Sequence, residues 1–122
     1  MVRIIVAVQN ATALWAMKTM LQEQPDITMV GEAADGEALL TAAELQEADL
    51  ILVDSKLPRI CFANLLARLH ALMPRPFVVA IGSHVEDLQP ALDAGADGFF
   101  SQIDGPDGLL NYVRHFDNGT RS

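Results

Sequence analysis

An acidic residue, Asp54, stands directly after residues 50–53, a run of aliphatic side chains. Such a continuous apolar run is typical of a strand that is buried on both faces of a sheet. A carboxylate at the end of that strand is held rigidly and can act as a nucleophile. Because Asp is also a favoured turn residue, a plain turn at Asp54 explains the position about equally well.

Polar residues also follow the other apolar runs of this kind. Open parallel sheets bind their ligands outside the carboxyl ends of the strands, so these side chains are expected to gather at one edge. The candidates are Gln9 and Asn10 after the first run, Ser55 and Lys56 beyond Asp54, Ser83 and His84 after the fourth run, and Gln102 after the fifth.

The chain alternates between such runs and longer segments with helical spacing. Strands are predicted at 4–8, 27–33, 50–53, 77–81 and 98–101. Helices are predicted up to about residue 24, over 37–46, between Pro58 and Leu72, over 86–94 with Gly95 as a cap, and after Pro106. A turn is predicted at Asp35 and Gly36. Because parallel neighbours need crossovers, and crossovers are right-handed, this order predicts a parallel sheet with helices on both faces.

The composition of the chain limits the classes of function that fit it. The 122 residues are 51% hydrophobic, which is enough for one domain with a buried core. Sixteen acidic against eight basic residues give a net charge of −8, which repels nucleic acid and anionic lipid. The early apolar run at 4–8 is too short to span a membrane, and the single cysteine cannot form an internal disulfide. A cytoplasmic protein without direct nucleic-acid binding is expected.

The segment around Asp54 resembles a known family. Residues 48–58 are similar to the third-strand segment of response-regulator receiver domains, in which the Asp after the strand takes a phosphoryl group from a histidine kinase. Residues 25–36 and 95–99 resemble the second and fifth strands of the subgroup that carries a helix-turn-helix output domain. The resemblance covers the whole chain.

This resemblance implies the flavodoxin-like (βα)5 fold, an α/β three-layer sandwich with a five-stranded parallel sheet. Residues 1–116 would form the receiver domain, and the polar residues 117–122 would begin a linker to an output domain. A histidine kinase or another signalling protein is the implied partner. A homodimer is also implied, through the first and fifth helices or through the fourth helix, fifth strand and fifth helix.

The family also has an acidic pair at the end of the first strand, which holds Mg²⁺ beside the phosphoacceptor. A count without gaps places this pair at Val8 and Gln9, and a shift by one residue places it at Gln9 and Asn10. Neither choice offers a carboxylate, so Mg²⁺ binding is expected to be weak or absent. The candidate ligands are Asp54, Gln9 and the backbone carbonyl of Lys56.

At other positions too, this sequence differs from the family pattern. The lysine after the fifth strand is replaced by Gln102, a neutral amide that cannot offset phosphoryl charge. The hydroxyl residue after the fourth strand falls on Ala80 without a gap, or on Ser83 if the loop is shorter. Phe99 stands at the family's aromatic switch position. A plain role, in which Phe99 only packs within its strand, is at least as good an interpretation. Arg59 is either a substitute cation or a solvated surface charge.

Two functions therefore stay open. One is an atypical receiver in phosphorelay signal transduction that regulates transcription, with Asp54 as phosphoacceptor and impaired Mg²⁺-dependent phosphorylation. The other is a pseudo-receiver, a protein-interaction or dimerisation module independent of phosphorylation. An enzyme is not expected: hydrolases with an aspartate nucleophile resemble one another in a second Asp two residues later, where Lys56 stands here.

Overall fold

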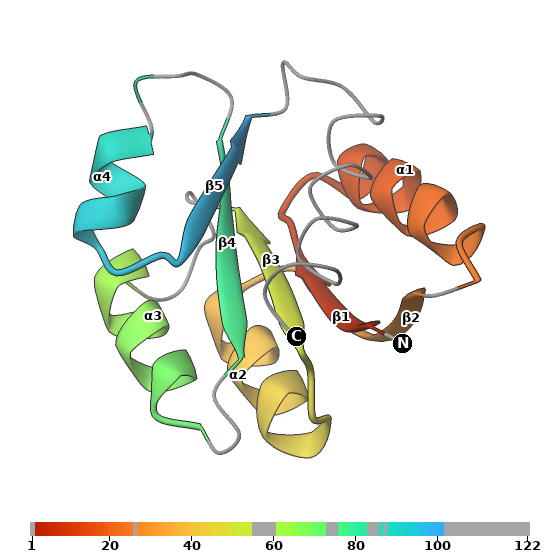
Figure 1. Ribbon diagram of the computed structural model, residues 1–122, viewed down its shortest axis with the longest axis horizontal. Helices are drawn as coiled ribbons and strands as arrows, with labels where there is room; N and C mark the ends of the chain where they lie inside the picture. The colour runs from red at the N-terminus through yellow and green to blue at the C-terminus, as the bar shows by residue number, and fades with distance from the viewer. Residues whose placement is uncertain are drawn as a thin grey trace.

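A parallel β-sheet organises the chain (Figure 1). In this computed structural model the described residues are 2–25, 27–54, 61–72, 76–82, 86 and 88–101. Within them the sheet has five strands in the order β2-β1-β3-β4-β5. The strands are β1 (Val2–Ala7), β2 (Ile27–Ala33), β3 (Leu50–Asp54), β4 (Phe77–Gly82) and β5 (Gly98–Ser101). The helices are α1 (Ala11–Gln22), α2 (Gly36–Leu45), α3 (Phe62–His70) and α4 (Leu88–Asp93). This topology confirms the predicted flavodoxin-like α/β fold.

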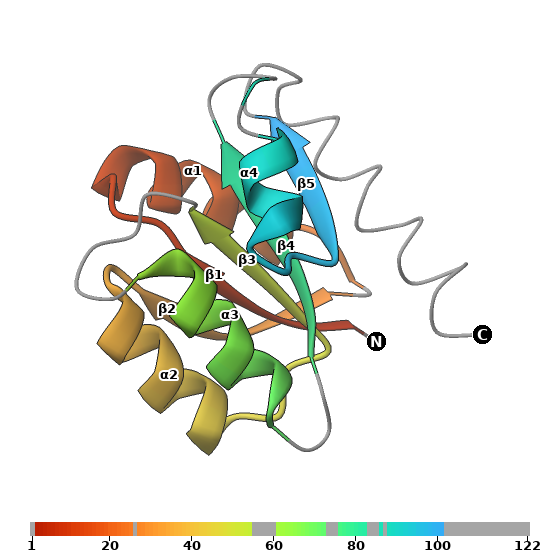
Figure 2. The ribbon, with the colours of Figure 1, turned by 90° about the vertical axis from the view of Figure 1, so that its left-hand side faces the viewer.

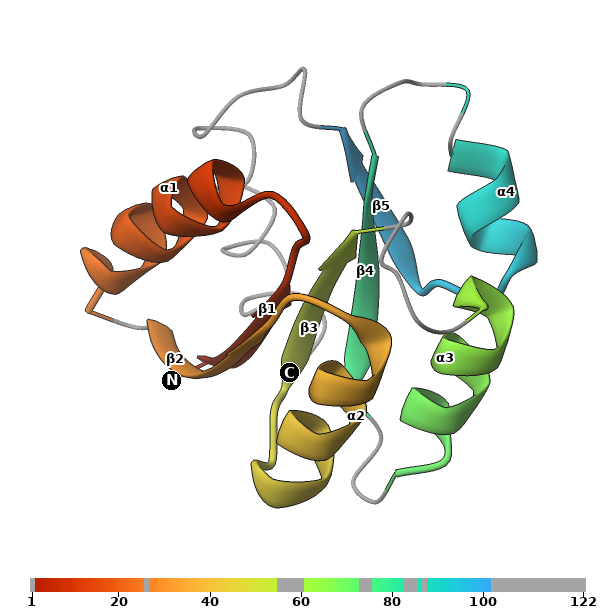
Figure 3. The same ribbon diagram turned by 180° about the vertical axis from the view of Figure 1, so that it is seen from behind.

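The helices cover both faces of the sheet, as Figures 2 and 3 show from two sides. Helix α1 packs on one face, where Leu21 joins Ile4, Val6 and Leu52 in a buried cluster. Helices α2, α3 and α4 pack on the other face. We call these the α1 face and the α2–α3 face. Because helices cover both faces of the central strands β1 and β3, their sequences are continuous apolar runs rather than alternating ones.

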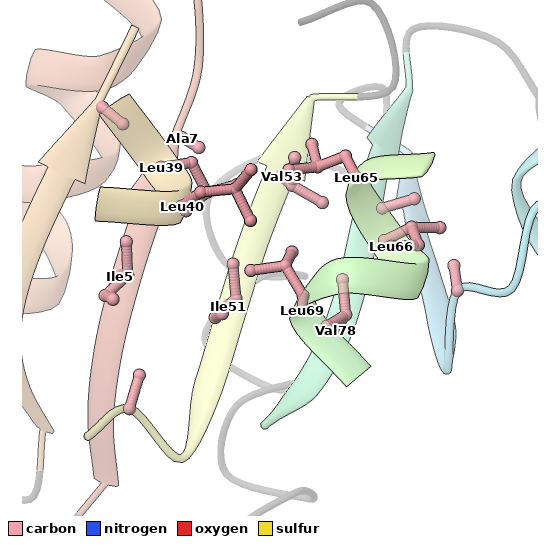
Figure 4. Packing of buried hydrophobic residues seen from close by; sticks show 14 of the residues in the cluster. Ile5, Ala7, Leu39, Leu40, Ile51, Val53, Leu65, Leu66, Leu69 and Val78 are labelled. Carbon is pink, nitrogen blue, oxygen red and sulfur yellow. The ribbon is translucent and has the colours of Figure 1, made fainter. Parts of the chain in front are cut away.

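The core on the α2–α3 face is built from leucines that point from the helices onto the sheet (Figure 4). They are Leu39 and Leu40 of α2 and Leu65, Leu66 and Leu69 of α3, and they contact Ile5, Ile51, Val53 and Val78. All but Leu40 of these leucines are fully buried. Burying a leucine side chain contributes about 1.5–3 kcal/mol, so this layer fixes α2 and α3 against β1, β3 and β4.

Most predicted elements are confirmed, with shifted ends. The strands predicted at 27–33 and 98–101 match β2 and β5 at both ends. Strand β1 begins earlier than predicted, because Val2 already pairs with Ile27. The predicted turn at Asp35 is instead the start of α2: the Asp35 carboxylate accepts a hydrogen bond from the Ala38 amide at 2.8 Å. The helix predicted after Pro106 lies outside the described residues.

The predicted cap at Gly95 is confirmed. Gly95 has φ of 113°, in the left-handed region that glycine enters without steric cost. Its amide donates to the Leu92 carbonyl at 3.0 Å, and the Ala96 amide donates to the Ala91 carbonyl at 3.1 Å. These bonds satisfy carbonyls at the end of α4 and turn the chain into β5.

Two aspartates fasten the amino ends of neighbouring strands. Asp49 precedes β3, and its carboxylate accepts from the Arg3 amide of β1 at 3.0 Å. Asp97 precedes β5, and one carboxylate oxygen lies 2.9 Å from both the Val78 amide of β4 and the His70 ring Nε2. In each case the aspartate amide also donates to the carbonyl of the same partner residue. The side chains therefore extend the backbone ladder and hold the register of β3 and β5.

We expect Asp97→Ala to lower the free energy of unfolding by about 1–3 kcal/mol, because it leaves the part-buried Val78 amide and His70 ring without this acceptor. Urea denaturation measures the change. Asp93→Ala is the control, since Asp93 is exposed and its carboxylate accepts a hydrogen bond from the exposed Gln89 side chain. A loss no larger than that of Asp93→Ala would contradict a fastening role for Asp97.

Candidate functional site

Asp54 is the last residue of β3 and is half-buried. Along β3, Leu50 and Leu52 belong to the α1 face and Ile51 and Val53 to the α2–α3 face. Because side chains alternate along a strand, Asp54 belongs to the α1 face. The carboxyl ends of the neighbouring strands meet at the same edge of the sheet (Figure 1). The prediction that Asp54 stands at this edge is confirmed.

The residues level with Asp54 on both neighbouring strands are apolar. Ile81 of β4 is its Cα partner in the ladder. On the other side Ala7 pairs with Val53, so the next residue, Val8, comes level with Asp54. Ile81 and Val8 are each 1% exposed and belong to the α1 face. The Asp54 carboxylate is therefore flanked by hydrocarbon on both sides within the sheet.

Neither residue of the expected acidic pair provides a charged ligand. Val8 is a core residue whose amide donates to the Ala33 carbonyl at 3.1 Å. Gln9 is exposed, so its amide side chain is accessible at this edge. By the pairing of β1 with β3, Val8 is level with Asp54, and Gln9 and Asn10 follow it along the chain.

Asn10 has a structural role that was not predicted from the sequence. It is the N-cap of α1, and its Oδ1 accepts a hydrogen bond from the Ala13 amide at 3.0 Å. Its backbone carbonyl accepts from the Leu14 amide at 2.9 Å. Asn directly before a segment with helical spacing is a strong N-cap signal, and it was available in the sequence. The amide oxygen of Asn10 is thus engaged by the helix.

The strand register also shows where Ala80 lies, which is the candidate for the hydroxyl position without a gap. Ala80 pairs with Val53, one residue before Asp54, and Ile81 is the residue level with Asp54. Neither side chain carries a hydroxyl. Phe99 pairs with Ala80 and packs against the core of the α2–α3 face, which is the plain strand role considered for it. Lys56, Arg59, Ser83 and Gln102 lie outside the described residues, and their predicted roles stay predictions.

The described residues at this edge fit a Mg²⁺ ion poorly. The ion prefers carboxylate oxygens, and here Asp54 is the carboxylate that the end of β3 offers. Asp35, at the end of β2, uses its carboxylate to cap α2. Among the described residues no group of three or more His, Cys, Asp or Glu side chains is placed to hold a metal.

Comparisons with known proteins agree with this fold. The response regulator receiver domain family matches residues 4–114. The nitrate/nitrite response regulator protein NarL of Escherichia coli is 38% identical over 96 residues, which are 77% of this chain and 44% of NarL. The transcriptional regulatory protein PdtaR of Mycobacterium tuberculosis is 33% identical over 95 residues, 77% of this chain and 46% of PdtaR.

A solved structure is similar over almost the whole chain. It is the signal receiver domain of the putative response regulator NarL from Mycobacterium tuberculosis, with a TM-score of 0.85, 24% identity and 97% of each chain covered. The chain spans less than half the length of the two sequence relatives. Within the described part, no helix is both long and apolar enough to cross a bilayer.

The N-cap role of Asn10 predicts how substitutions behave. We expect Asn10→Ala to lower the free energy of unfolding by about 1 kcal/mol, because the Ala13 amide loses its acceptor. Asn10→Asp should keep the stability, since Asp caps as well as Asn does. Denaturant midpoints measure both. Equal stability of the Asn10→Ala variant and the unchanged chain would show that the cap contributes nothing.

Proposed function

Because the chain belongs to the response regulator receiver domain family, we propose that it is an atypical receiver of a two-component system, in which Asp54 accepts the phosphoryl group but Mg²⁺-dependent phosphorylation is impaired. The observation that carries the proposal is the setting of Asp54. It stands at the carboxyl end of β3, as a phosphoacceptor should, but it is level with Val8 and Ile81 rather than with a second carboxylate and a hydroxyl.

The physical cause of the proposed impairment is the loss of acidic ligands for Mg²⁺. Phosphoryl transfer depends on positive charge that neutralises the transferred group, and Mg²⁺ ordinarily supplies it. Among the described residues, the end of β3 offers the carboxylate of Asp54 and the residues level with it offer none, so the ion gains little attraction to offset the loss of its water ligands. The hydrocarbon of Val8 and Ile81 adds no ligand. The net charge of −8 further disfavours an added anion.

The second candidate is a pseudo-receiver that binds partners without phosphorylation. It is favoured because residues at this edge already have structural roles. Val8 is part of the core, and the side-chain oxygen of Asn10 caps α1. In that case the fold is retained as a scaffold for protein contacts. The two candidates differ in one measurable respect, which is whether Asp54 ever carries a phosphoryl group.

We base the proposed wider role of the chain on the names of its sequence relatives. NarL is named as a response regulator and PdtaR as a transcriptional regulatory protein, and we propose that this chain likewise serves transcription regulation in the cytoplasm. A histidine kinase is the proposed phosphodonor, and a homodimer is a further proposed assembly. DNA contact would belong to another part of the protein, because a domain of net charge −8 repels phosphate backbones.

Adding a carboxylate beside Asp54 should create Mg²⁺ affinity. We expect Gln9→Asp to bind Mg²⁺ roughly tenfold more tightly than the unchanged chain, since ligand charge sets affinity at such sites. Amide chemical shifts during a Mg²⁺ titration measure this. Gln22→Asp adds the same charge at the far end of α1 and should have no effect. Shifts centred on Asp54 at millimolar Mg²⁺ in the unchanged chain, equal to those of Gln9→Asp, would contradict impaired binding.

Phosphorylation separates the two candidate functions. Incubation with acetyl phosphate and Mg²⁺, followed by intact mass measurement, should give a slow and partial phosphoryl adduct on the unchanged chain. The adduct should be absent from Asp54→Asn and faster on Gln9→Asp, because the added carboxylate recruits the ion. If the unchanged chain and Asp54→Asn stay identical in mass, the pseudo-receiver is correct. If the unchanged chain reacts as fast as Gln9→Asp, the proposal of impaired phosphorylation is wrong.

A further inference from the structure

A groove opens at the end of the sheet opposite to Asp54. It lies between the carboxyl end of α2, the start of β3, and the residues Leu72 and Pro76. Its lining is Ala43, Glu44, Gln46, Glu47, Ala48, Ile51, Leu72 and Pro76, and we call it the α2–Leu72 groove. Ile51, the lining residue that belongs to β3, is three residues from Asp54, which corresponds to about 10 Å along the strand.

The floor of the α2–Leu72 groove is apolar. Ile51 is fully buried and Ala48 is 8% exposed, and Ala43 and Leu72 pack against the same core. The neighbouring Leu45, in the last turn of α2, is 76% exposed. An apolar side chain that entered the groove would therefore find hydrocarbon on its floor and beside it, and would lose its contact with water.

The rim of the groove is negative. Glu44 lies in the last turn of α2 and Glu47 two residues beyond its end, where the helix carbonyls already give partial negative charge. The last turn of α2 holds no basic residue. The ion pairs seen among the described residues involve Glu32 and Asp97 and leave Glu44 and Glu47 out. Acidic residues at a helix carboxyl end are unfavourable in the isolated chain, and a bound cation would relieve that repulsion.

We propose that the α2–Leu72 groove is a docking site for a cationic segment of a partner protein, with one apolar side chain seated on the floor and lysine or arginine side chains at Glu44 and Glu47. A second copy of this chain is a poor occupant, because each copy carries a net charge of −8. A nucleic acid is excluded by the same rim. Docking here does not involve Asp54, so it is independent of the proposed phosphorylation.

A synthetic peptide tests directly whether the groove binds a segment that is both cationic and apolar. The probe is a fluorescein-labelled amphipathic peptide of lysine and leucine, compared with one that has serine in place of leucine and one that has glutamate in place of lysine. Fluorescence anisotropy measures affinity, and amide chemical shifts locate the peptide on the unchanged chain. We expect the lysine–leucine peptide to bind most tightly, with shifts concentrated at residues 43–48 and at Leu72.

The variant Glu44→Gln/Glu47→Gln removes the negative rim. It should weaken binding of the lysine–leucine peptide roughly three- to tenfold, as expected for two partly exposed ion pairs. Glu23→Gln/Glu86→Gln is the matched control: it removes the same charge at exposed sites outside the groove. Its affinity should stay within about twofold of the unchanged chain, because only distant, screened attraction is lost.

Three results would overturn the proposal. The first is equal weakening by both double variants, which would mean attraction to the overall charge alone. The second is equal affinity for the serine peptide, which would mean that the apolar floor is unused. The third is self-association of the chain in light scattering that the groove variant removes, which would make a second copy the occupant. None of these measurements uses Mg²⁺ or a phosphodonor, so failure here leaves the proposed function untouched.

Discussion

The parallel register of β1, β3 and β4 is the constraint on which the candidate site depends. Ala7 faces Val53 and Asp54 faces Ile81, so whatever side chains follow Ala7 or occupy the end of β4 must surround Asp54. The register is held from the opposite end, where Asp49 ties β3 to β1 through side-chain and backbone hydrogen bonds. The fold thus places the carboxylate correctly whether or not its neighbours can support phosphoryl chemistry.

Val8 and Asn10, two of the candidates for the expected acidic pair, contribute to stability. Carboxylates crowded at one edge repel one another until a cation joins them, and this repulsion opposes folding. Val8 instead adds a buried side chain to the α1 face, and Asn10 satisfies an amide of the first turn of α1. Sites that need charge are commonly held at the expense of stability. At this edge Val8 packs in the core and Asn10 caps α1, so these two candidate positions serve stability rather than charge.

Much of the fold was predictable from the sequence, because continuous apolar runs and helical spacing report burial directly. The site was less predictable. Counting along the sequence left the hydroxyl position at Ala80 or Ser83, and the structure adds that Ala80 pairs with Val53 and Ile81 with Asp54. Loop lengths alter such a count, and only the ladder reveals the pairing. Whether the Asn10 oxygen caps a helix or is available to a ligand also depends on geometry, since both roles use the same residue type.

Distance along a buried strand also bears on whether Asp54 and the α2–Leu72 groove communicate. Residues 50–53 of β3 are fully buried and pair with β1 and β4 on both sides. Close-packed interiors deform little, and coupling between two sites requires an element with two arrangements that both ligands favour differently. Strand β3 lies between the two sites and is held by pairing on both sides. We therefore expect the proposed docking at the groove and the proposed phosphorylation of Asp54 to be independent of each other.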